Sequence, residues 1–242
     1  MHYFVSDIHL GSGDKTEQRR VERLFLDFLA KIEADAETLF LVGDIFDFWF
    51  EYKQVVPKGF VRVLGRLAEL SDKGIRVVML TGNHDMWVDD YLTEECGIEL
   101  YTTPQRFTLA GKELFVAHGD NMNIKGTPVL QAMNAMFRSK CLRWLASGLI
   151  HPNCFMRFGK WWSGKSRKSH GVVQSTTVLQ PLIDFAVEYG KEQKVDYFVF
   201  GHMHYPADVA TEQRILFMGD WQSTPNYLAL NDKGEITLNI IK

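Results

Sequence analysis

The chain has 242 residues, 46% of them hydrophobic, and a formal net charge of −3 at pH 7. This length and composition allow a proper core and exclude a disordered or fibrous protein. A membrane-spanning helix is also excluded, because it needs about 20 apolar residues and the richest stretch, residues 133–150, carries Arg138, Lys140 and Arg143. We expect residues 1–242 to form a single domain, because no Gly, Ser or Pro-rich linker divides them.

The first third of the chain alternates short β-rich runs with amphipathic stretches. Apolar runs predict strands at 2–6, 38–42 and 76–81, and apolar residues at three- and four-residue steps predict helices at 21–32 and 59–70. This alternation predicts an α/β fold with a largely parallel sheet covered on both faces. Further on, residues 106–118 predict a hairpin turning at Gly111-Lys112. More antiparallel pairing is expected among later strands, at 194–200, 214–219, 226–230 and 236–240.

Residues 125–170 interrupt this rhythm with a helical pattern, and we interpret them as an insertion. Between Asp120 and Asp184 there are nine Lys and Arg residues and no acidic residue, which leaves 18 basic against 30 acidic residues in the remainder. Two interpretations remain open. Either the bulky side chains line an apolar groove while the basic groups hold phosphate or an anionic membrane, or they form the insertion's own core and solvated face. These bulky residues are Met133, Met136, Phe137, Trp144, Phe155, Trp161 and Trp162.

The cellular setting is suggested by the N-terminus and the cysteines. The chain begins MHYFVSDIHL, where an acidic residue and a histidine interrupt the apolar run that a signal peptide needs, so we expect no secretion. The three cysteines, Cys96, Cys141 and Cys154, lie far apart and form no CxxC pair. Both observations favour a reduced, cytoplasmic setting.

Five polar clusters fall where predicted strands end. Ligands bind beyond the carboxyl ends of the strands in open α/β sheets, so we expect the clusters to share one site. Each alone is weak, since Gly-Asp and Gly-Asn are common in turns and a lone HxH pair is often structural. Their conjunction, with five of the eight histidines inside them, favours a functional site. The clusters are Asp7-Ile8-His9, Gly43-Asp44, Gly82-Asn83-His84-Asp85, His118-Gly119-Asp120 and Gly201-His202-Met203-His204.

The residue types in these clusters indicate metal ions. Carboxylate, amide and imidazole groups form a mixed oxygen and nitrogen ligand set suited to Mn²⁺, Fe or Zn²⁺. Asp7 and His9 are two residues apart, as are His202 and His204. This spacing puts both side chains of each pair on the same side of an extended segment. The neighbouring glycines let the backbone turn sharply into the site. Seven side chains, enough for two ions, are candidate ligands: Asp7, His9, Asp44, Asn83, His118, His202 and His204.

The series D-x-H, G-D, G-N-H-D, H-G-D and G-H-x-H, between residues 7 and 204, resembles the signature of the calcineurin-like metallophosphoesterases. The resemblance implies a four-layer α/β/β/α sandwich, a dinuclear metal centre and hydrolysis of a phosphate ester or anhydride by a metal-bridging hydroxide. By position, it also implies how the ligands divide: Asp7, His9 and His204 for one metal, Asn83, His118 and His202 for the other, and Asp44 as the bridge.

Two side chains beside these ligands are candidates for catalysis. A water held between two divalent ions loses its proton near neutral pH and attacks phosphorus in line, so no protein nucleophile is needed. His84 is placed to donate a hydrogen bond to the transition state or a proton to the leaving oxygen, and Asp85 to orient His84. A capping or packing role for His84 at a helix start is the alternative.

A narrower resemblance concerns the substrate. The segments SDIHL, GDIFDFWF, GNHD, HGD, GHMH and GDW, with a helical Lys/Arg/Ser-rich insertion between HGD and GHMH, resemble the UDP-2,3-diacylglucosamine pyrophosphohydrolases of lipid A biosynthesis. The resemblance implies cleavage of that lipid-linked nucleotide to UMP and 2,3-diacylglucosamine 1-phosphate, with Mn²⁺ as the usual metal. It further implies a lid over the acyl chains, formed by the insertion, and a peripheral position on the cytoplasmic face of the inner membrane.

The same resemblance implies which residues contact substrate phosphate. They are Asn83, His84, Lys165, Arg167 and Lys168. Well-known members of that family have Arg where this chain has His84. Arg is a fixed cation with a fork suited to phosphate, whereas His can also give up a proton.

Other functions remain open at this level. A soluble phosphodiesterase or nuclease would use the basic segment along a polynucleotide backbone, although the anionic remainder of the chain argues against it. A non-catalytic scaffold of the same fold usually lacks metal ligands, and this chain has every expected one. Nucleic-acid reading is not expected, because no helix-turn-helix or zinc-finger spacing is present.

Overall fold

The computed structural model describes residues 1–122, 135–136, 139–170 and 176–241, without the side chains of residues 140, 165–170 and 176. These residues form two sheets, with the strand orders β11-β10-β1-β2-β3-β4 and β5-β6-β7-β9-β8. The first sheet contains β1 (His2–Val5), β2 (Thr38–Val42), β3 (Arg76–Leu80), β4 (Glu99–Tyr101), β10 (Asn226–Leu230) and β11 (Ile236–Ile240). The second contains β5 (Gln105–Leu109), β6 (Lys112–Ala117), β7 (Tyr197–Phe200), β8 (Ala207–Ala210) and β9 (Arg214–Phe217).

Strand direction follows the predicted division of the chain. The four strands β1 to β4 are mutually parallel, and so are β6, β7 and β9 in the second sheet. Antiparallel pairs join β10 to β1 and β11, β5 to β6, and β8 to β9. Parallel pairing therefore dominates the first third, and antiparallel pairing enters with the later strands, as expected.

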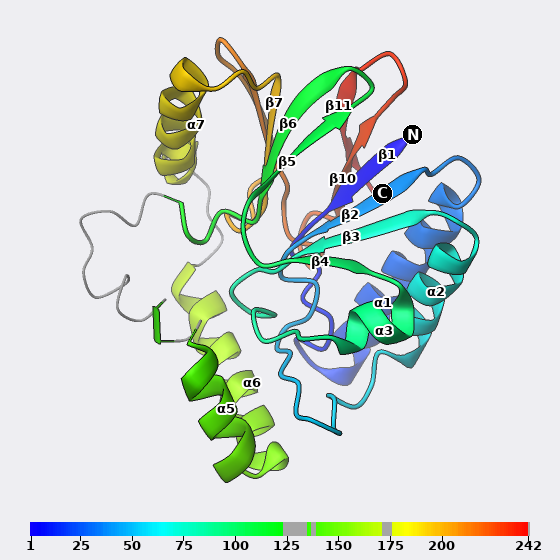
Figure 1. The fold of residues 1–242 in the computed structure, drawn as a ribbon, viewed down its shortest axis with the longest axis vertical. Coiled ribbons are helices and arrows are strands. Elements are labelled where there is room, and N and C mark those ends of the chain that lie inside the picture. Colours follow the sequence, from blue (N-terminus) through cyan, green and yellow to red (C-terminus); the bar gives the residue numbers. More distant parts are fainter. Residues whose placement is uncertain (123–134, 137–138, 171–175, 242) are drawn as a thin grey trace.

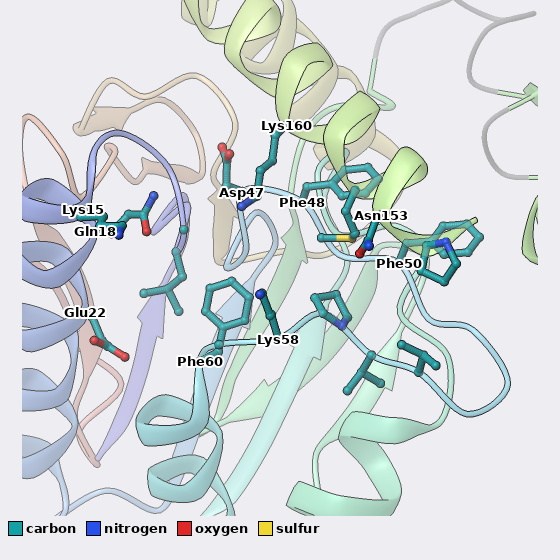
Figure 2. Close-up of a pocket in the computed structure, with 18 of the residues that line it drawn as sticks. Lys15, Gln18, Glu22, Asp47, Phe48, Phe50, Lys58, Phe60, Asn153 and Lys160 are labelled. Carbon is teal, nitrogen blue, oxygen red and sulfur yellow. The ribbon is translucent and has the colours of Figure 1, made fainter. Parts of the chain in front are cut away.

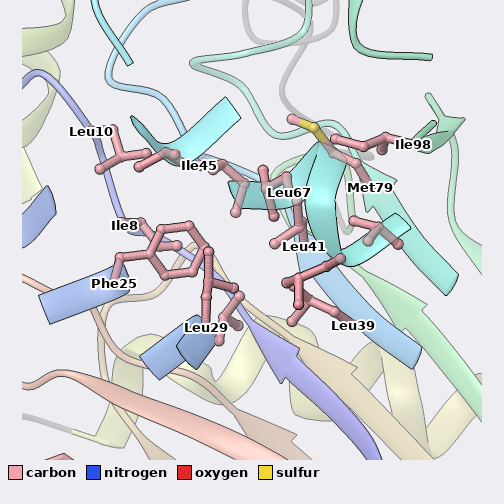
Figure 3. Close-up of a cluster of buried hydrophobic side chains, with 14 of the residues drawn as sticks. Ile8, Leu10, Phe25, Leu29, Leu39, Leu41, Ile45, Leu67, Met79 and Ile98 are labelled. Atoms are coloured by element: carbon pink, nitrogen blue, oxygen red, sulfur yellow. The ribbon is translucent and has the colours of Figure 1, made fainter. Parts of the chain in front are cut away.

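Helices cover the outer faces of both sheets, and the two sheets pack against each other (Figure 1). Phe25 and Leu41 belong to the cluster between the first sheet and its helices (Figure 3), and Phe4 and Val199 to the cluster between the sheets. The four-layer α/β/β/α prediction is confirmed. The first sheet is covered by α1 (Lys15–Ile32), α2 (Val61–Asp72) and α3 (Tyr91–Cys96), and the second by η1 (Thr176–Leu179) and α7 (Gln180–Glu192).

Burial on both faces explains why β1 and β2 are continuous apolar runs. Phe4 and Phe40 stack between the sheets with ring centroids 4.6 Å apart, while their neighbours Val5 and Leu41 face the helices. α1 begins six residues before its predicted start, because the Asp14 carboxylate caps it by accepting from the backbone N–H groups of the first turn.

Several elements were not predicted from the periodicity. α3, β4 and β8 have six, three and four residues, which is too short for a period to emerge. α7 is long enough, and its buried Leu182 and Ala186 follow helical spacing, so its signal was available. The β5–β6 hairpin pairs Leu109 with Lys112, so the turn lies at residues 110–111, one residue earlier than predicted.

Within the predicted insertion, the structure describes two helices, α5 (Lys140–Leu149) and α6 (Pro152–His170). Figure 1 shows the pair next to the edge where β1, β2 and β3 end. Met133 and Phe137 lie outside the described residues, as do the side chains of three predicted phosphate contacts, Lys165, Arg167 and Lys168. Among the described residues, no helix is long and apolar enough to cross a membrane.

Candidate metal centre

The five polar clusters meet at one edge of the two sheets. Asp7, Asp44 and Asn83 follow the parallel strands β1, β2 and β3, and His118 and His202 follow the parallel strands β6 and β7 of the second sheet. Because parallel strands end on the same side, their following loops converge. Three groups of His and Asp ligand atoms result, each within 4.8 Å: Asp7, His9 and His204; His9, Asp44 and His84; and Asp44, His118 and His202.

Backbone strain is concentrated in these clusters. Left-handed φ angles occur at Asp7 (54°), His9 (49°), Asp44 (54°), His202 (68°) and His204 (54°). Such a conformation costs about 1–3 kcal/mol per non-glycine residue and persists only where the surroundings over-determine it. The loops are therefore held in shapes that the chain does not prefer, as is common at functional sites.

The first group is centred on the buried Asp7. Its Oδ2 accepts from Ser6 Oγ at 2.5 Å and from the His202 backbone N–H at 2.9 Å. These bonds turn Oδ1 toward the imidazoles, 3.2 Å from His204 Nε2 and 3.9 Å from His9 Nε2. The two ring nitrogens lie 3.2 Å apart. Two nitrogens bound at about 2.0–2.1 Å to one ion are about 3.0–3.4 Å apart, so the spacing fits a shared metal.

The second group is centred on Asp44. Its Oδ1 accepts from the His84 backbone N–H at 2.8 Å, which leaves Oδ2 3.3 Å from His118 Nε2 and 3.9 Å from His9 Nε2. Asn83 joins this group, because its Oδ1 lies 3.3 Å from His118 Nε2. One oxygen of Asp44 thus faces imidazoles of both groups, which is the position of a bridging ligand.

His84 also enters the cluster, with Nε2 3.9 Å from Asp44 Oδ2. Its ring is oriented by the Asp47 carbonyl, which accepts from Nδ1 at 2.8 Å. The expectation that Asp85 orients His84 is therefore wrong. The buried Asp85 carboxylate instead accepts from the backbone N–H groups of Gly82 at 2.7 Å and Ile45 at 2.8 Å, and so fastens the loop after β3 to the loop after β2.

Electrostatics favour the ligand forms of several side chains. Burial lowers the pKa of His9 to about 3, and burial with the charge of His118 lowers the pKa of His202 to about 4, so both rings are neutral at pH 7. Burial acts to raise the pKa of Asp7, but His204 and His118 outweigh it and lower that pKa to about 2. Neutral imidazole and ionised carboxylate are the forms that bind metals.

His118 differs from the other histidines. Burial acts to lower its pKa, but the charge and hydrogen bond of Asp44 outweigh burial and hold the pKa well above its usual value. The raised pKa favours a protonated His118 beside Asp44 at neutral pH in the metal-free protein. A cation that binds there must displace this proton, so cation binding and deprotonation are coupled.

Buried polar atoms provide the test of whether a metal fits. Among the described residues, neither Asp7 Oδ1 nor His9 Nδ1 has a hydrogen-bond partner. A buried carboxylate oxygen without a hydrogen bond is costly, and a cation at the first group, where the His204 ring lies 3.2 Å from Asp7 Oδ1, would compensate it. The mixed oxygen and nitrogen donor set, its burial and the nitrogen spacing all fit a divalent transition metal.

A cavity of about 560 Å³ lies beside this cluster, and Figure 2 shows residues of its wall. Its wall includes Leu10, which follows His9 in sequence, and Asp47, whose carbonyl accepts from His84. The remaining wall comes from the first turns of α1, the loop 48–60 and the start of α6, and it combines apolar and cationic side chains with one carboxylate, Glu22, which is paired with Arg19. Examples are Phe48, Phe50, Phe60 and Met156 on the apolar side, and Lys15, Arg19, Lys58 and Lys160 among the cations.

The structure adds three residues that the sequence reasoning missed. Ser6 holds Asp7, Asp47 holds His84, and Ser163 of α6 donates a hydrogen bond to Asp47 Oδ1 at 2.5 Å. Asp47 lies three residues after Asp44 within the segment GDIFDFWF, so its place in that segment was a signal. Nothing in the local pattern distinguished Ser163, because its partner is 116 residues away.

Two stacked sheets with Asp, Asn and His side chains gathered at their strand ends define a metal-dependent hydrolase. The calcineurin-like phosphoesterase family matches residues 3–206, and the chain belongs to this family.

Two relatives in sequence agree with this assignment. UDP-2,3-diacylglucosamine hydrolase of Porphyromonas gingivalis is 37% identical over 236 residues, covering 90% of this chain and 89% of that protein. The enzyme of the same name from Histophilus somni is 26% identical over 240 residues, covering 96% and 97%. Among solved structures, Vps29 from Entamoeba histolytica complexed with Zn²⁺ is similar with a TM-score of 0.44 and 11% identity, covering 99% and 97%.

Proposed function

We propose that this chain hydrolyses UDP-2,3-diacylglucosamine to UMP and 2,3-diacylglucosamine 1-phosphate. The observation that carries the proposal is the cavity of about 560 Å³ beside the candidate metal centre, whose wall combines apolar and cationic side chains. A substrate with acyl chains and a diphosphate presents the complementary chemistry, and the cavity has the size of a typical ligand pocket. The names of the relatives support the same substrate, and they do not favour a nuclease.

The proposed reaction uses two divalent metal ions, which we assign as Mn²⁺. Bound to this chain, they supply Lewis acidity toward a phosphoryl oxygen and lower the pKa of a water. The spacing of the three ligand groups supports the assignment. We assign one ion to Asp7, His9 and His204, the other to Asn83, His118 and His202, and the shared position to Asp44.

The chain's own contribution is to orient donors and acceptors around the phosphate. His118 donates from Nδ1 to the Val42 carbonyl at 3.0 Å, so that its Nε2 faces the site. His84 donates from Nδ1 to the Asp47 carbonyl, so only its Nε2 can reach substrate. With Nδ1 already carrying a hydrogen, Nε2 donates to a phosphate oxygen only as the imidazolium. We assign this donor role to His84.

Product analysis tests the substrate. Purified protein with Mn²⁺ is incubated with UDP-2,3-diacylglucosamine, and UMP release is followed by chromatography for wild type and Asp44→Ala. We expect UMP from wild type and at least a hundredfold less from the variant, because Asp44 serves both ion positions. If the lipid-linked nucleotide stays intact while bis(p-nitrophenyl) phosphate or single-stranded DNA is hydrolysed rapidly, the proposed substrate is wrong and another phosphodiester takes its place.

The role of His84 is tested by two substitutions. His84→Arg keeps a cationic donor, whereas His84→Ala removes it. Loss of one transition-state donor costs roughly 10²–10³ in kcat, so we expect that loss for Ala and a much smaller one for Arg. Equal activity of the Ala variant and wild type would leave His84 only a structural role.

We also propose that the protein acts at the cytoplasmic face of the inner membrane, held peripherally by α5 and α6. Both helices expose large apolar side chains, including Trp144 (67% exposed), Leu149 (76%) and Trp161 (59%). The acid-free interval around them favours an anionic surface. The three cysteines are free, in keeping with a reducing compartment.

Vesicle sedimentation tests this location. Trp144→Ser/Leu149→Ser should lower binding to phosphatidylglycerol vesicles about tenfold, because two exposed apolar side chains are removed from the interface. The matched control is Val61→Ser/Ile240→Ser, which removes two exposed apolar side chains (77% and 50%) outside the insertion. Equal losses in both pairs, or no binding by wild type, would argue against the membrane proposal.

A further inference from the structure

One row of described residues on α6 contacts the loop that follows the predicted ligand Asp44. Phe155, Gly159 and Ser163 are spaced by four residues, so they lie in one row along the helix. All three contact the segment 47–50 that follows Asp44. Phe158 and Trp161 of the same helix are 42% and 59% exposed. The docked row of α6 is therefore distinct from its exposed apolar side chains.

The first two positions of the row set the distance of the helix. The Phe155 ring lies with its centroid 4.4 Å from Phe50 and 5.7 Å from Trp87. Gly159 is buried and lies so close to Phe48 that a Cβ on it would be 2.3 Å from the Phe48 ring. Only a residue without a side chain allows this approach. The helix is thus held close enough for its next turn to touch the metal centre's own loop.

The third position makes a polar contact inside that interface. Ser163 is 1% exposed and Asp47 4%, and Ser163 Oγ donates to Asp47 Oδ1 at 2.5 Å. A buried hydrogen bond to a carboxylate is among the stronger kinds. It fixes one oxygen of Asp47 from a helix that also forms a wall of the cavity through Met156 and Lys160.

Asp47 faces the candidate metal centre on its other side. Its carbonyl accepts from His84 Nδ1 at 2.8 Å, and its Oδ1 lies 4.0 Å from His9 Nδ1. Metal-binding histidines usually donate their second ring N–H to a carboxylate or a carbonyl. His118 does so through Val42, but His9 Nδ1 has no such partner within the described part of the chain. A movement of about 1 Å would bring Asp47 Oδ1 to hydrogen-bond distance of His9.

We propose that Asp47 is a positioning residue that accepts the Nδ1 hydrogen of His9 when metal is bound, and that Ser163 of α6 holds Asp47 in place for this. The inference rests on the proposed two-metal function. Its consequence is that docking of α6 over the cavity adjusts the metal centre itself. α6 then has a part in metal binding as well as in forming the substrate cavity.

A purely mechanical explanation makes a different prediction. If the Ser163–Asp47 bond merely fastened α6 to the body, its loss would resemble the loss of any other fastening. The chain offers such a fastening, the ion pair between Arg143 of α5 and Asp89, which involves no predicted ligand. It also offers a serine in the same segment, Ser147, whose hydroxyl donates to the Trp144 carbonyl of its own helix.

The experiment measures Mn²⁺ dissociation constants by electron paramagnetic resonance of free Mn²⁺, with no substrate present. The full chain is compared with Ser163→Ala, Asp47→Ala and the double variant, with Ser147→Ala and Asp89→Asn as controls. Loss of an outer partner of a metal ligand typically weakens binding about 10–100-fold, which we expect for Asp47→Ala. We expect about a tenfold loss for Ser163→Ala, and no further loss when Ser163→Ala is added to Asp47→Ala.

Rescue separates positioning from folding. Asp47→Asn keeps an oxygen that can accept from His9, so it should bind Mn²⁺ more tightly than Asp47→Ala at similar melting temperature. Wild-type affinity in Ser163→Ala, additive losses in the double variant, or equal losses in Ser163→Ala and the controls would each overturn the proposal. Because no substrate is present, failure to cleave the lipid-linked nucleotide would leave this result unaffected. Wild-type protein that binds no Mn²⁺ would overturn both proposals.

Discussion

Replacement of Gly82 by Ala tests how closely the loops of the metal centre approach one another. Gly82 precedes Asn83, and a Cβ on it would lie 2.2 Å from Asp44 Oδ1 and 2.7 Å from the Asp44 backbone nitrogen. The Gly82 backbone is not left-handed, so Ala can adopt its φ and the effect is one of contact alone. Ordinary contact begins at 3.4 Å, so Asp44 and the 82–84 loop must separate by more than 1 Å.

The expected cost has two parts. Overpacking in a tight site costs about 1–3 kcal/mol. The separation also breaks the hydrogen bond from the His84 backbone N–H to Asp44 Oδ1, now 2.8 Å, and a bond to a charged acceptor contributes about 1.5–3 kcal/mol. We therefore expect the metal-free protein to lose about 3–5 kcal/mol of unfolding free energy. Mn²⁺ affinity should fall at least tenfold, because Asp44 is displaced.

Gly65→Ala is the matched control. Gly65 lies inside α2, and within the described part of the chain a Cβ there meets no atom within 4 Å. Ala is the better helix former, so this variant should gain about 0.5–1 kcal/mol. Urea denaturation in EDTA measures both changes. The same chemical substitution should thus have opposite signs at the two sites. A Gly82→Ala protein with wild-type stability and wild-type Mn²⁺ affinity would refute the close approach of these loops.

Three further predictions concern the same region. Asp85→Ala should lower the unfolding free energy by about 3–6 kcal/mol, because the Gly82 and Ile45 N–H groups lose their shared charged acceptor. Asp90 is exposed, so Asp90→Ala should change the unfolding free energy by less than about 1 kcal/mol. Guanidinium denaturation measures the unfolding free energy of both variants. Equal losses would contradict the role of Asp85 in joining the two loops. Lys58→Glu should raise KM for the lipid-linked nucleotide about tenfold, because the new carboxylate repels the diphosphate in the cavity, and it should leave kcat for bis(p-nitrophenyl) phosphate within twofold. An unchanged KM would place the substrate elsewhere. Asp44 raises the pKa of His118, so the metal-free site is protonated at neutral pH and Mn²⁺ affinity should increase from pH 6 to pH 8. A constant Mn²⁺ dissociation constant would show that no proton is displaced.

The fold was predictable to the extent that local pattern reflects burial. β1 and β2 are apolar at every position because one face meets helices and the other meets the second sheet, and this made them visible in the sequence. β4 and β8, at sheet edges and only three and four residues long, carry no such pattern. The turn of the β5–β6 hairpin was misplaced by one residue, because register depends on pairing rather than on the Gly alone.

The candidate ligands were predictable because the folding rule for parallel strands needs no side-chain detail. Asp7, Asp44 and Asn83 each follow a strand of one parallel set, so their meeting follows once the strands are recognised. Asp85 shows the limit of this reasoning. Its position beside His84 suggested an orienting role, but its carboxylate turns to the backbone of the neighbouring loop.

By itself, the sequence determined the candidate chemistry of this protein: a set of candidate oxygen and nitrogen ligands at strand ends, and an acid-free segment with a helical pattern. These are properties of residue type and order, and they do not depend on how distant segments meet. Only the tertiary structure decided the support of that chemistry, such as Asp47 holding His84 and Ser163 of α6 holding Asp47. The physical reason is distance along the chain. A hydrogen bond between residues 116 positions apart depends on the packing of whole helices and loops, which no local pattern encodes.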